Sequence, residues 1–185
     1  MKNLLGYAFF ILSLFTGLSA SSQIPQGKTA STTLNVTLAN VYDIQIGQSS
    51  VSIKMNSPIH FTAGNNSGKQ TGHLSVSCNT GYEVKVSAST ELLNGTSSIP
   101  VNTITVKPEL GAFKGMGTAP SVTDVTLMET PLYAAGPKTI ILKNTGESKR
   151  EYDVDYSISA LTANAYMNKI PGNYSTTVTY SLFSK

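Results

Sequence analysis

The chain has 185 residues, of which 40% are hydrophobic and 12% are charged, with a formal net charge of +3, one cysteine and no tryptophan. This length suits one domain of ordinary size, with a core that needs neither a disulfide nor a metal. The low charge and a mean hydropathy near zero exclude an intrinsically disordered chain. The weak, scattered positive charge argues against a nucleic-acid partner.

Residues 1–22 have the three-part pattern of a secretory signal peptide. Lys2 supplies the positive charge, residues 4–15 form an apolar stretch, and small residues follow. The apolar stretch is shorter than the roughly 20 residues that span a bilayer. We therefore predict a signal peptide over 1–22, one domain over 23–185 with an N-terminal extension at 23–40, and no transmembrane anchor.

The rest of the chain is made of short runs in which apolar and polar residues alternate, separated by Gly, Pro and Asn. This period of two is typical of strands with one buried face, and no window of helical length has a 3.6-residue period. In chain order the runs are 34–38, 42–46, 51–55, 59–61, 74–78, 82–86, 104–106, 125–127, 139–142, 152–158 and 178–182. Run 139–142 is apolar on both faces, as in a central strand, and 161–167 is expected to be a loop with one or two helical turns. The pattern predicts an all-β fold, an immunoglobulin-like antiparallel β-sandwich of about eight or nine strands.

Motifs that carry catalytic chemistry are scarce. The chain has two histidines, and it lacks the spacings typical of zinc sites, nucleophile elbows and nucleotide-binding loops. Cys78, the single cysteine, lies on the same side of its run as Leu74 and Val76, so we expect a buried thiol and no internal disulfide. We predict a protein that is not an enzyme and that has no cofactor or metal.

Three acids, Glu151, Asp153 and Asp155, share one face of the run at 152–158. Calcium sites need oxygen ligands that converge from loops, whereas acids along a strand are spaced in a row. We expect a solvated face that discourages edge-to-edge pairing. A calcium site is the alternative.

Two stretches resemble a known group of secreted β-sandwiches. Residues 71–88, TGHLSVSCNTGYEVKVSA, resemble the G-x-L-x-V-x-C and Y-x-V core of the spore coat protein U and fimbrial-subunit group. Residues 171–183, PGNYSTTVTYSLF, are similar to the Gly-x-Tyr-led final strand of chaperone–usher pilus subunits. Gly172 is fourteenth from the C-terminus, where those subunits carry a glycine, but Ser184 stands where they carry an aromatic residue.

The resemblance implies an incomplete sandwich that receives the N-terminal segment of the next subunit. Such strand addition supplies backbone hydrogen bonds along an open edge and pockets for alternate side chains. Head-to-tail donation builds an open fibre. Many such subunits carry a disulfide between the first strand and the strand that corresponds to the run around Cys78, whereas this chain has no second cysteine. The candidate donor strand consists of Leu34, Val36 and Leu38, and the candidate C-terminal groove strand carries Tyr174, Thr176, Val178, Tyr180 and Leu182.

The predicted function is a non-enzymatic exported structural or adhesive surface subunit that forms fimbria-like polymers by donor-strand exchange. The resemblance implies like subunits as partners, together with a periplasmic chaperone and an outer-membrane usher, and transit through the periplasm to the cell surface, a fimbrium or the medium. The alternative is a stand-alone secreted binding module, for which Tyr133 and Tyr166 would present aromatic rings to a carbohydrate. Run 34–38 would then be the first strand of a closed sandwich.

Overall fold

The computed structural model describes residues 27–185, so the predicted signal peptide lies outside the described residues. The chain divides into a unit that ends at Thr37 and a compact unit from Leu38 to Lys185. The described residues of the first unit, 27–37, are exposed and carry no regular secondary structure. The second unit holds all the strands and helices described below.

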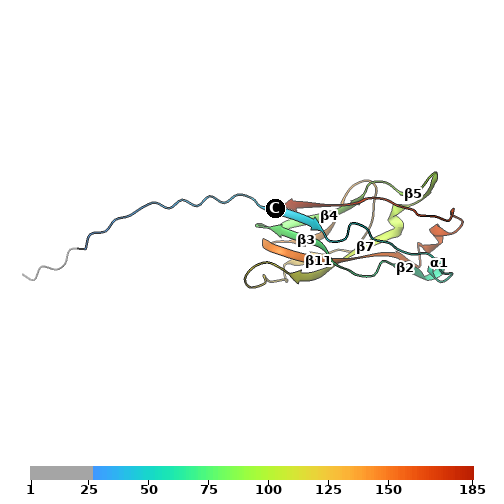
Figure 1. Cartoon of the computed structure of the whole chain (residues 1–185), viewed down its shortest axis with the longest axis horizontal. Coiled ribbons are helices and arrows are strands. Elements are labelled where there is room, and N and C mark those ends of the chain that lie inside the picture. Colours follow the sequence, from blue (N-terminus) through green and yellow to red (C-terminus); the bar gives the residue numbers. More distant parts are fainter. Residues whose placement is uncertain (1–26) are drawn as a thin grey trace, which may run out of the picture. The chain divides into compact units, whose positions relative to one another are not determined.

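The compact unit is an antiparallel β-sandwich, as predicted (Figure 1). The larger sheet has the order β1-β3-β11-β7-β9, with β2 paired to β11; the smaller sheet has the order β12-β4-β10-β8; β5 and β6 form a separate hairpin. The strands are β1 Tyr42–Ile46, β2 Gly64–Asn66, β3 Gln70–Cys78, β4 Tyr82–Ala88, β5 Leu92–Asn94, β6 Ser97–Ile99, β7 Ile104–Phe113, β8 Val125–Leu127, β9 Thr130–Pro131, β10 Lys138–Lys143, β11 Glu147–Ser159 and β12 Val178–Ser184. These twelve strands exceed the predicted eight or nine because β2, β5, β6 and β9 are pairings of only two or three residues.

The core lies between the two sheets and is filled by alternate residues of their strands. Along β4 every second residue is buried, from Tyr82 to Ala88. In β10, which lies between β4 and β8, the adjacent residues Ile140 and Ile141 are both fully buried, because a bulge in the pairing with β4 lies between Thr139 and Ile141. The central position predicted for run 139–142 is confirmed, and Cys78 is a buried free thiol as expected.

Two predicted strands are wrong. Residues 60–63 form the short helix α1 (His60–Ala63), whose first turn is closed by hydrogen bonds from the His60 and Phe61 amides to the Ser57 and Pro58 carbonyls. Pro58 is the second residue of the turn that leads into this helix, a position that its fixed φ suits. Residues 51–55 keep their alternation of half-buried and exposed side chains but form no strand.

Two 3₁₀ helices complete the fold. The first, η1, spans Val101–Thr103, and the second, η2, spans Ala163–Tyr166. The second falls within the region 161–167, where one or two helical turns were predicted. Helix η2 contacts α1, so α1 and η2 lie together at one end of the sandwich (Figure 1).

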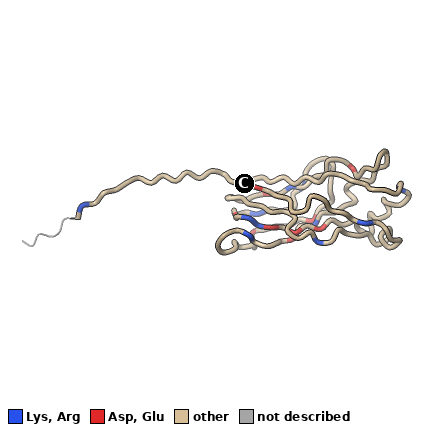
Figure 2. The backbone as a smooth tube through the Cα atoms, viewed as in Figure 1, with Lys and Arg blue, Asp and Glu red and all other residues tan. Residues whose placement is uncertain are grey.

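The prediction of a solvated acidic face on β11 is wrong, because Asp153 is buried and Glu151 and Asp155 are half-buried. This strand is central, between β3 and β7, and Asp153 is only 5% exposed. Its carboxylate accepts a hydrogen bond from the Gly72 amide at 2.8 Å and forms an ion pair with Lys69 at 2.9 Å. Glu109 extends this network by pairing with Lys69 and Lys107, both at 3.2 Å. Figure 2 shows residues of opposite charge intermingled over this part of the larger sheet.

Candidate functional site: a groove between two free backbone edges

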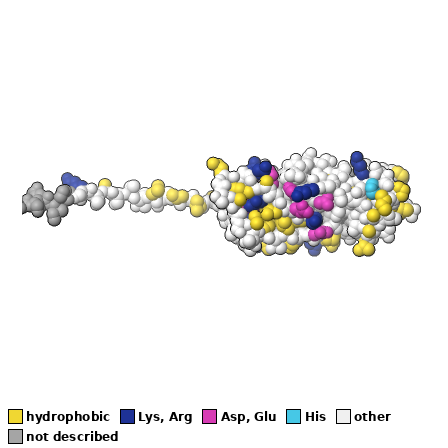
Figure 3. All heavy atoms as spheres, turned by 90° about the horizontal axis from the view of Figure 1, so that it is seen from below, with side chains coloured by type: hydrophobic (Ala, Val, Ile, Leu, Met, Phe, Trp, Pro, Cys, Tyr) yellow, Lys and Arg dark blue, Asp and Glu magenta, His cyan; other side chains and the backbone are white. Residues whose placement is uncertain are grey.

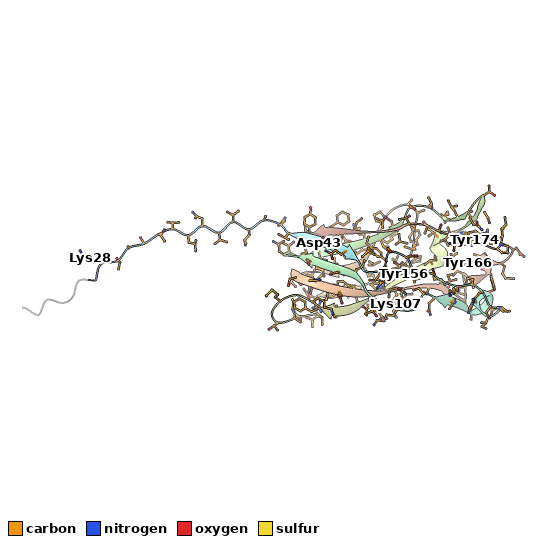
Figure 4. The ribbon with its side chains drawn as sticks, in the orientation of Figure 1. Lys28, Asp43, Lys107, Tyr156, Tyr166 and Tyr174 are labelled. Carbon is orange, nitrogen blue, oxygen red and sulfur yellow. The ribbon has the colours of Figure 1, made fainter. Side chains whose placement is uncertain are left out.

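A groove of about 520 Å³ opens between the segment that follows β1 and the segment that leads into β12. One wall carries Val51 and Ile53, the opposite wall carries Tyr174 and Val178, and Leu132 contributes to the floor. The volume lies within the roughly 300–1,000 Å³ typical of binding pockets. Figure 4 shows Tyr174 toward the α1 end of the sandwich.

Both walls of the groove have backbone groups that no other part of the described chain pairs. Strand β12 pairs with β4 along its whole length, from Val178 opposite Ala88 to Ser184 opposite Tyr82, and its second edge is open. On the facing wall, residues 49–55 make no backbone–backbone hydrogen bond within the described residues, although the Lys54 carbonyl accepts a hydrogen bond from the Asn65 side chain at 2.6 Å. An open edge of this kind is a template for a further strand.

The structure brings most of the predicted groove residues to this site. Tyr174, Thr176, Val178 and Tyr180 line the groove, whereas Leu182 lies outside its lining and packs against the core. Regular pairing begins only at Val178. Before it, the chain is held to its own neighbours by an isolated bridge from Ser175 to Leu93 and by the Thr176 hydroxyl, which donates to the Thr90 carbonyl at 2.8 Å.

A chain of neutral polar groups crosses the floor of the groove. The His73 ring bonds through Nδ1 to Gln48 Oε1 and through Nε2 to the Tyr156 hydroxyl, both at 2.8 Å, and the Tyr156 hydroxyl bonds to that of Tyr180. Since Gln48 Oε1 can only accept, Nδ1–H donates to it and Nε2 accepts from Tyr156. Burial lowers the pKa of His73 and raises the pKa of Tyr156 to about 12, so both groups are neutral at neutral pH.

A bulge in β3 turns His73 into the sandwich. Tyr152 pairs with Leu74 and Val154 pairs with Gln70, so two extra residues of β3 lie between these pairs. Gly72 in the bulge has a φ of +61°, a conformation that glycine adopts without strain. As a result His73 and its neighbour Leu74 are both buried, contrary to simple alternation.

The candidate donor residues are strongly exposed. The exposed fractions of Leu34, Val36 and Leu38 are 84%, 75% and 87%. Directly after them the chain is fixed by Asn79 in the β3–β4 turn. Its side chain donates to the Ala39 carbonyl at 2.8 Å and accepts from the Val41 amide at 2.9 Å, so the base of the candidate donor is attached to the sandwich.

A second buried polar cluster, which sequence reasoning missed, lies at the opposite end from α1. The Tyr82 hydroxyl lies 2.6 Å from both Glu147 Oε1 and the Tyr152 hydroxyl, and Arg150 Nε donates to Glu147 Oε2 at 3.0 Å. The Arg150 guanidinium lies over the Phe113 ring, 5.2 Å from its centroid, and its Nη2 has no hydrogen-bond partner within the described chain. Burial raises the pKa of Tyr82 and Tyr152, so their hydroxyls remain protonated.

The aromatic residues considered for sugar binding do not form an exposed platform. The Tyr166 hydroxyl bonds to Thr103 at 2.8 Å and its half-buried ring lines the groove, while the half-buried Tyr133 ring lies under Lys138. Within residues 27–185, no three His, Cys, Asp or Glu side chains gather as metal ligands. In the same range, no helix is long and apolar enough to span a membrane.

Comparison with known families gives one match. The sequence model of the fimbrillin-A associated anchor proteins Mfa1 and Mfa2 matches residues 53–184, which include the β12 wall of the groove, the end of the facing wall from Ile53 onward, and all the strands after β1. A search of curated proteins finds no match. The expected fimbrial relationship is confirmed, although the matched family is not that of spore coat protein U or the chaperone–usher subunits. Since the match covers well over half of the sequence, the chain belongs to the family of fimbrillin-A associated anchor proteins.

Proposed function

We propose that the protein is a non-enzymatic structural subunit, exported through the periplasm to the cell surface, that joins like subunits in a fimbria-like polymer by donor-strand exchange. Residues 33–39 of one copy would fill the groove of the next. The family match supports the fimbrial setting. The observation that carries the exchange is a groove that lies between the open outer edge of β12 and residues 49–55, which make no backbone–backbone hydrogen bond within the described chain.

The side chains of the donor segment suit such a groove. In an extended strand Leu34, Val36 and Leu38 point to one side, and Asn35 and Thr37 point to the other. Burying each of these large apolar side chains contributes roughly 1.5–3 kcal/mol. The incoming backbone would supply hydrogen-bond partners to both walls, so affinity does not depend on the apolar contacts alone.

We also propose that a chaperone and an usher protect each copy from premature association during export. Before exchange, each copy exposes three large apolar side chains and an unfilled groove with open backbone edges. Open edges and exposed apolar side chains promote uncontrolled association. A periplasmic chaperone that occupies the groove, and an outer-membrane usher that exchanges it for a donor, would prevent this.

The test is a charge substitution on the donor. The variant with Leu34→Asp, Val36→Asp and Leu38→Asp should form no polymers, measured by light scattering and by ladders in unboiled detergent gels. It should still accept a synthetic peptide of residues 31–41, because its groove is unchanged. Polymers of normal length from this variant would overturn the exchange mechanism.

The matched control places the same charges on the opposite face of the strand. The variant with Thr33→Asp, Asn35→Asp and Thr37→Asp gains the same net charge but keeps the three apolar side chains. It should polymerise like the wild type. If both variants fail equally, charge alone prevents association and side-chain insertion is not the cause.

A further inference from the structure

We propose that, in the assembled polymer, the two ends of the sandwich form a second interface between copies, in which the β1 end of the donor docks on the α1 end of the acceptor. This interface rests on the proposed strand exchange but is separate from the groove. Its partner is a second copy of this chain. The supporting observations are two exposed apolar patches, a short fixed connection, and the direction of β12.

Seven large exposed apolar side chains of the compact unit form a patch at each of its two ends, while others, such as Ile46, Leu110 and Met116, lie outside these patches. The α1-end patch surrounds the two short helices, and Figure 3 shows hydrophobic side chains near a histidine at this end. Its members are Ile59, Leu161, Met167 and Ile170. The β1-end patch lies where β1 begins and β12 ends, and its members are Val41, Tyr42 and Phe183. Charged residues of both signs lie between the ends (Figure 3).

The connection between the donor segment and the sandwich is short. Leu38 and Tyr42 are separated by four Cα steps, which reach at most about 14 Å. The Asn79 side chain further restrains this connection by bonding to Ala39 and Val41. A donor segment seated to Leu38 in another copy therefore brings its own β1-end patch close to that copy.

The direction of β12 determines which end of the acceptor it meets. All the paired strands of the described sandwich are antiparallel, and β12 runs toward the β1 end. We take the donor to add antiparallel to β12, because this wall is a regular strand, and therefore parallel to residues 49–55, which run from β1 toward α1. The donor then runs toward the α1 end, so Leu38 leaves the groove beside Gly172 and Tyr174. Ile170 lies two residues from this exit. The β1-end patch of the donor then faces the α1-end patch of the acceptor, a heterologous contact that repeats along a fibre.

The two proposals are separated by offering the acceptor either the donor segment alone or the whole subunit. The acceptor variant carries Leu161→Glu and Ile170→Glu, two exposed positions outside the core. Placed in the full-length chain with the three donor Asp substitutions, it should bind the peptide of residues 31–41 as tightly as its parent. In an otherwise wild-type chain, the same pair should make polymers dissociate in detergent at least about tenfold faster, as expected when charges enter an apolar contact.

The outcomes lead to different conclusions. Unchanged polymer dissociation together with normal peptide binding would overturn the end-to-end interface and leave strand exchange intact. Failure of the peptide to bind the parent chain would contradict strand exchange itself. The control is Leu110→Glu on β7, which adds a charge at an exposed apolar position outside both patches and should leave dissociation unchanged.

Cross-linking tests directly which ends of neighbouring subunits are adjacent, independently of whether strand exchange joins the subunits. Phe183→Cys and Leu161→Cys place one reactive thiol in each patch, and the native Cys78 is buried. A short bismaleimide should link subunits in a mixed polymer of the two variants and not in a polymer of either variant alone. Links within the polymer of Phe183→Cys alone would show that β1 ends meet each other, and would overturn the proposal.

Discussion

The sandwich contains two buried polar clusters built on tyrosine pairs, and they differ in charge and in surroundings. At the β1 end, Tyr82 and Tyr152 enclose the Glu147–Arg150 ion pair, whose side chains are 0% and 5% exposed. At the groove, Tyr156 and Tyr180 meet the neutral His73, and the cluster lines an open space. The first cluster is sealed within packed strands and the second lies at an unfilled surface.

This difference indicates where the sandwich depends on its own residues and where it can accept others. A buried ion pair must keep both of its members, because a lone charge in the core is very costly. A neutral chain of hydroxyl and imidazole groups tolerates rearrangement and solvent far better. The closed end is therefore expected to determine stability, and the groove to determine recognition. The following predictions test that division, beginning with the largest expected effect.

Removing the charge of Glu147 should destabilise the fold most. Glu147→Gln leaves the Arg150 guanidinium buried without a counterion, and loss of about 3 kcal/mol in the free energy of unfolding is expected. Urea denaturation measures it. The control is Glu151→Gln on the same strand, whose partner Lys114 is 52% exposed and 3.8 Å away, and which should lose less than about 1 kcal/mol. Similar losses in both variants would contradict the distinction.

Removing one hydroxyl from each cluster gives a smaller, graded comparison. Tyr82→Phe removes a bond to a carboxylate and should cost about 2 kcal/mol, whereas Tyr156→Phe removes bonds between neutral groups and should cost about 1 kcal/mol. Both keep the aromatic ring, so packing is nearly unchanged. The unfolding free energies of the two variants decide the order. A greater loss for Tyr156→Phe would assign the groove the structural role.

The smallest expected effect is a pH dependence that arises from the groove. Because burial lowers the pKa of His73 below 6.5, the unfolded chain binds a proton more readily than the folded one. The contribution of His73 to the free energy of unfolding is fully present above pH 6.5. It declines as the pH falls from 6.5 toward the lower pKa of His73 in the folded state. His73→Gln should flatten this decline in denaturation curves taken at successive pH values. His60→Gln, the control outside the groove, should leave it in place.

The sequence predicts the sandwich better than it predicts these clusters. Alternation locates eight of the strands because one face of each is buried. It fails where a bulge interrupts it. The positive φ of Lys149 accompanies a register shift between Glu147 and Arg150, so that both point inward although they are three residues apart. Similarly, the bulge at Gly72 buries His73.

The groove is unpredictable from local pattern for a different reason. Residues 51–55 alternate like a strand, but whether they pair depends on which backbone lies beside them in space. Tyr174, Val178 and Tyr180 line the groove as predicted. They could be predicted because the family resemblance pointed to the C-terminal strand. The facing wall had no corresponding sequence signal.

The ion network on the outer face of the larger sheet bears on how polymers would interact sideways. Lys69 and Lys107 pair with Asp153 and Glu109, so the face carries both signs with little net charge. Bringing two such faces together would strip water from ions that are already satisfied, with no new partners to gain. Association along the flanks is thus disfavoured while the apolar ends remain adhesive. In the proposed polymer, this difference between flanks and ends would favour single slender filaments over bundles and amorphous aggregates.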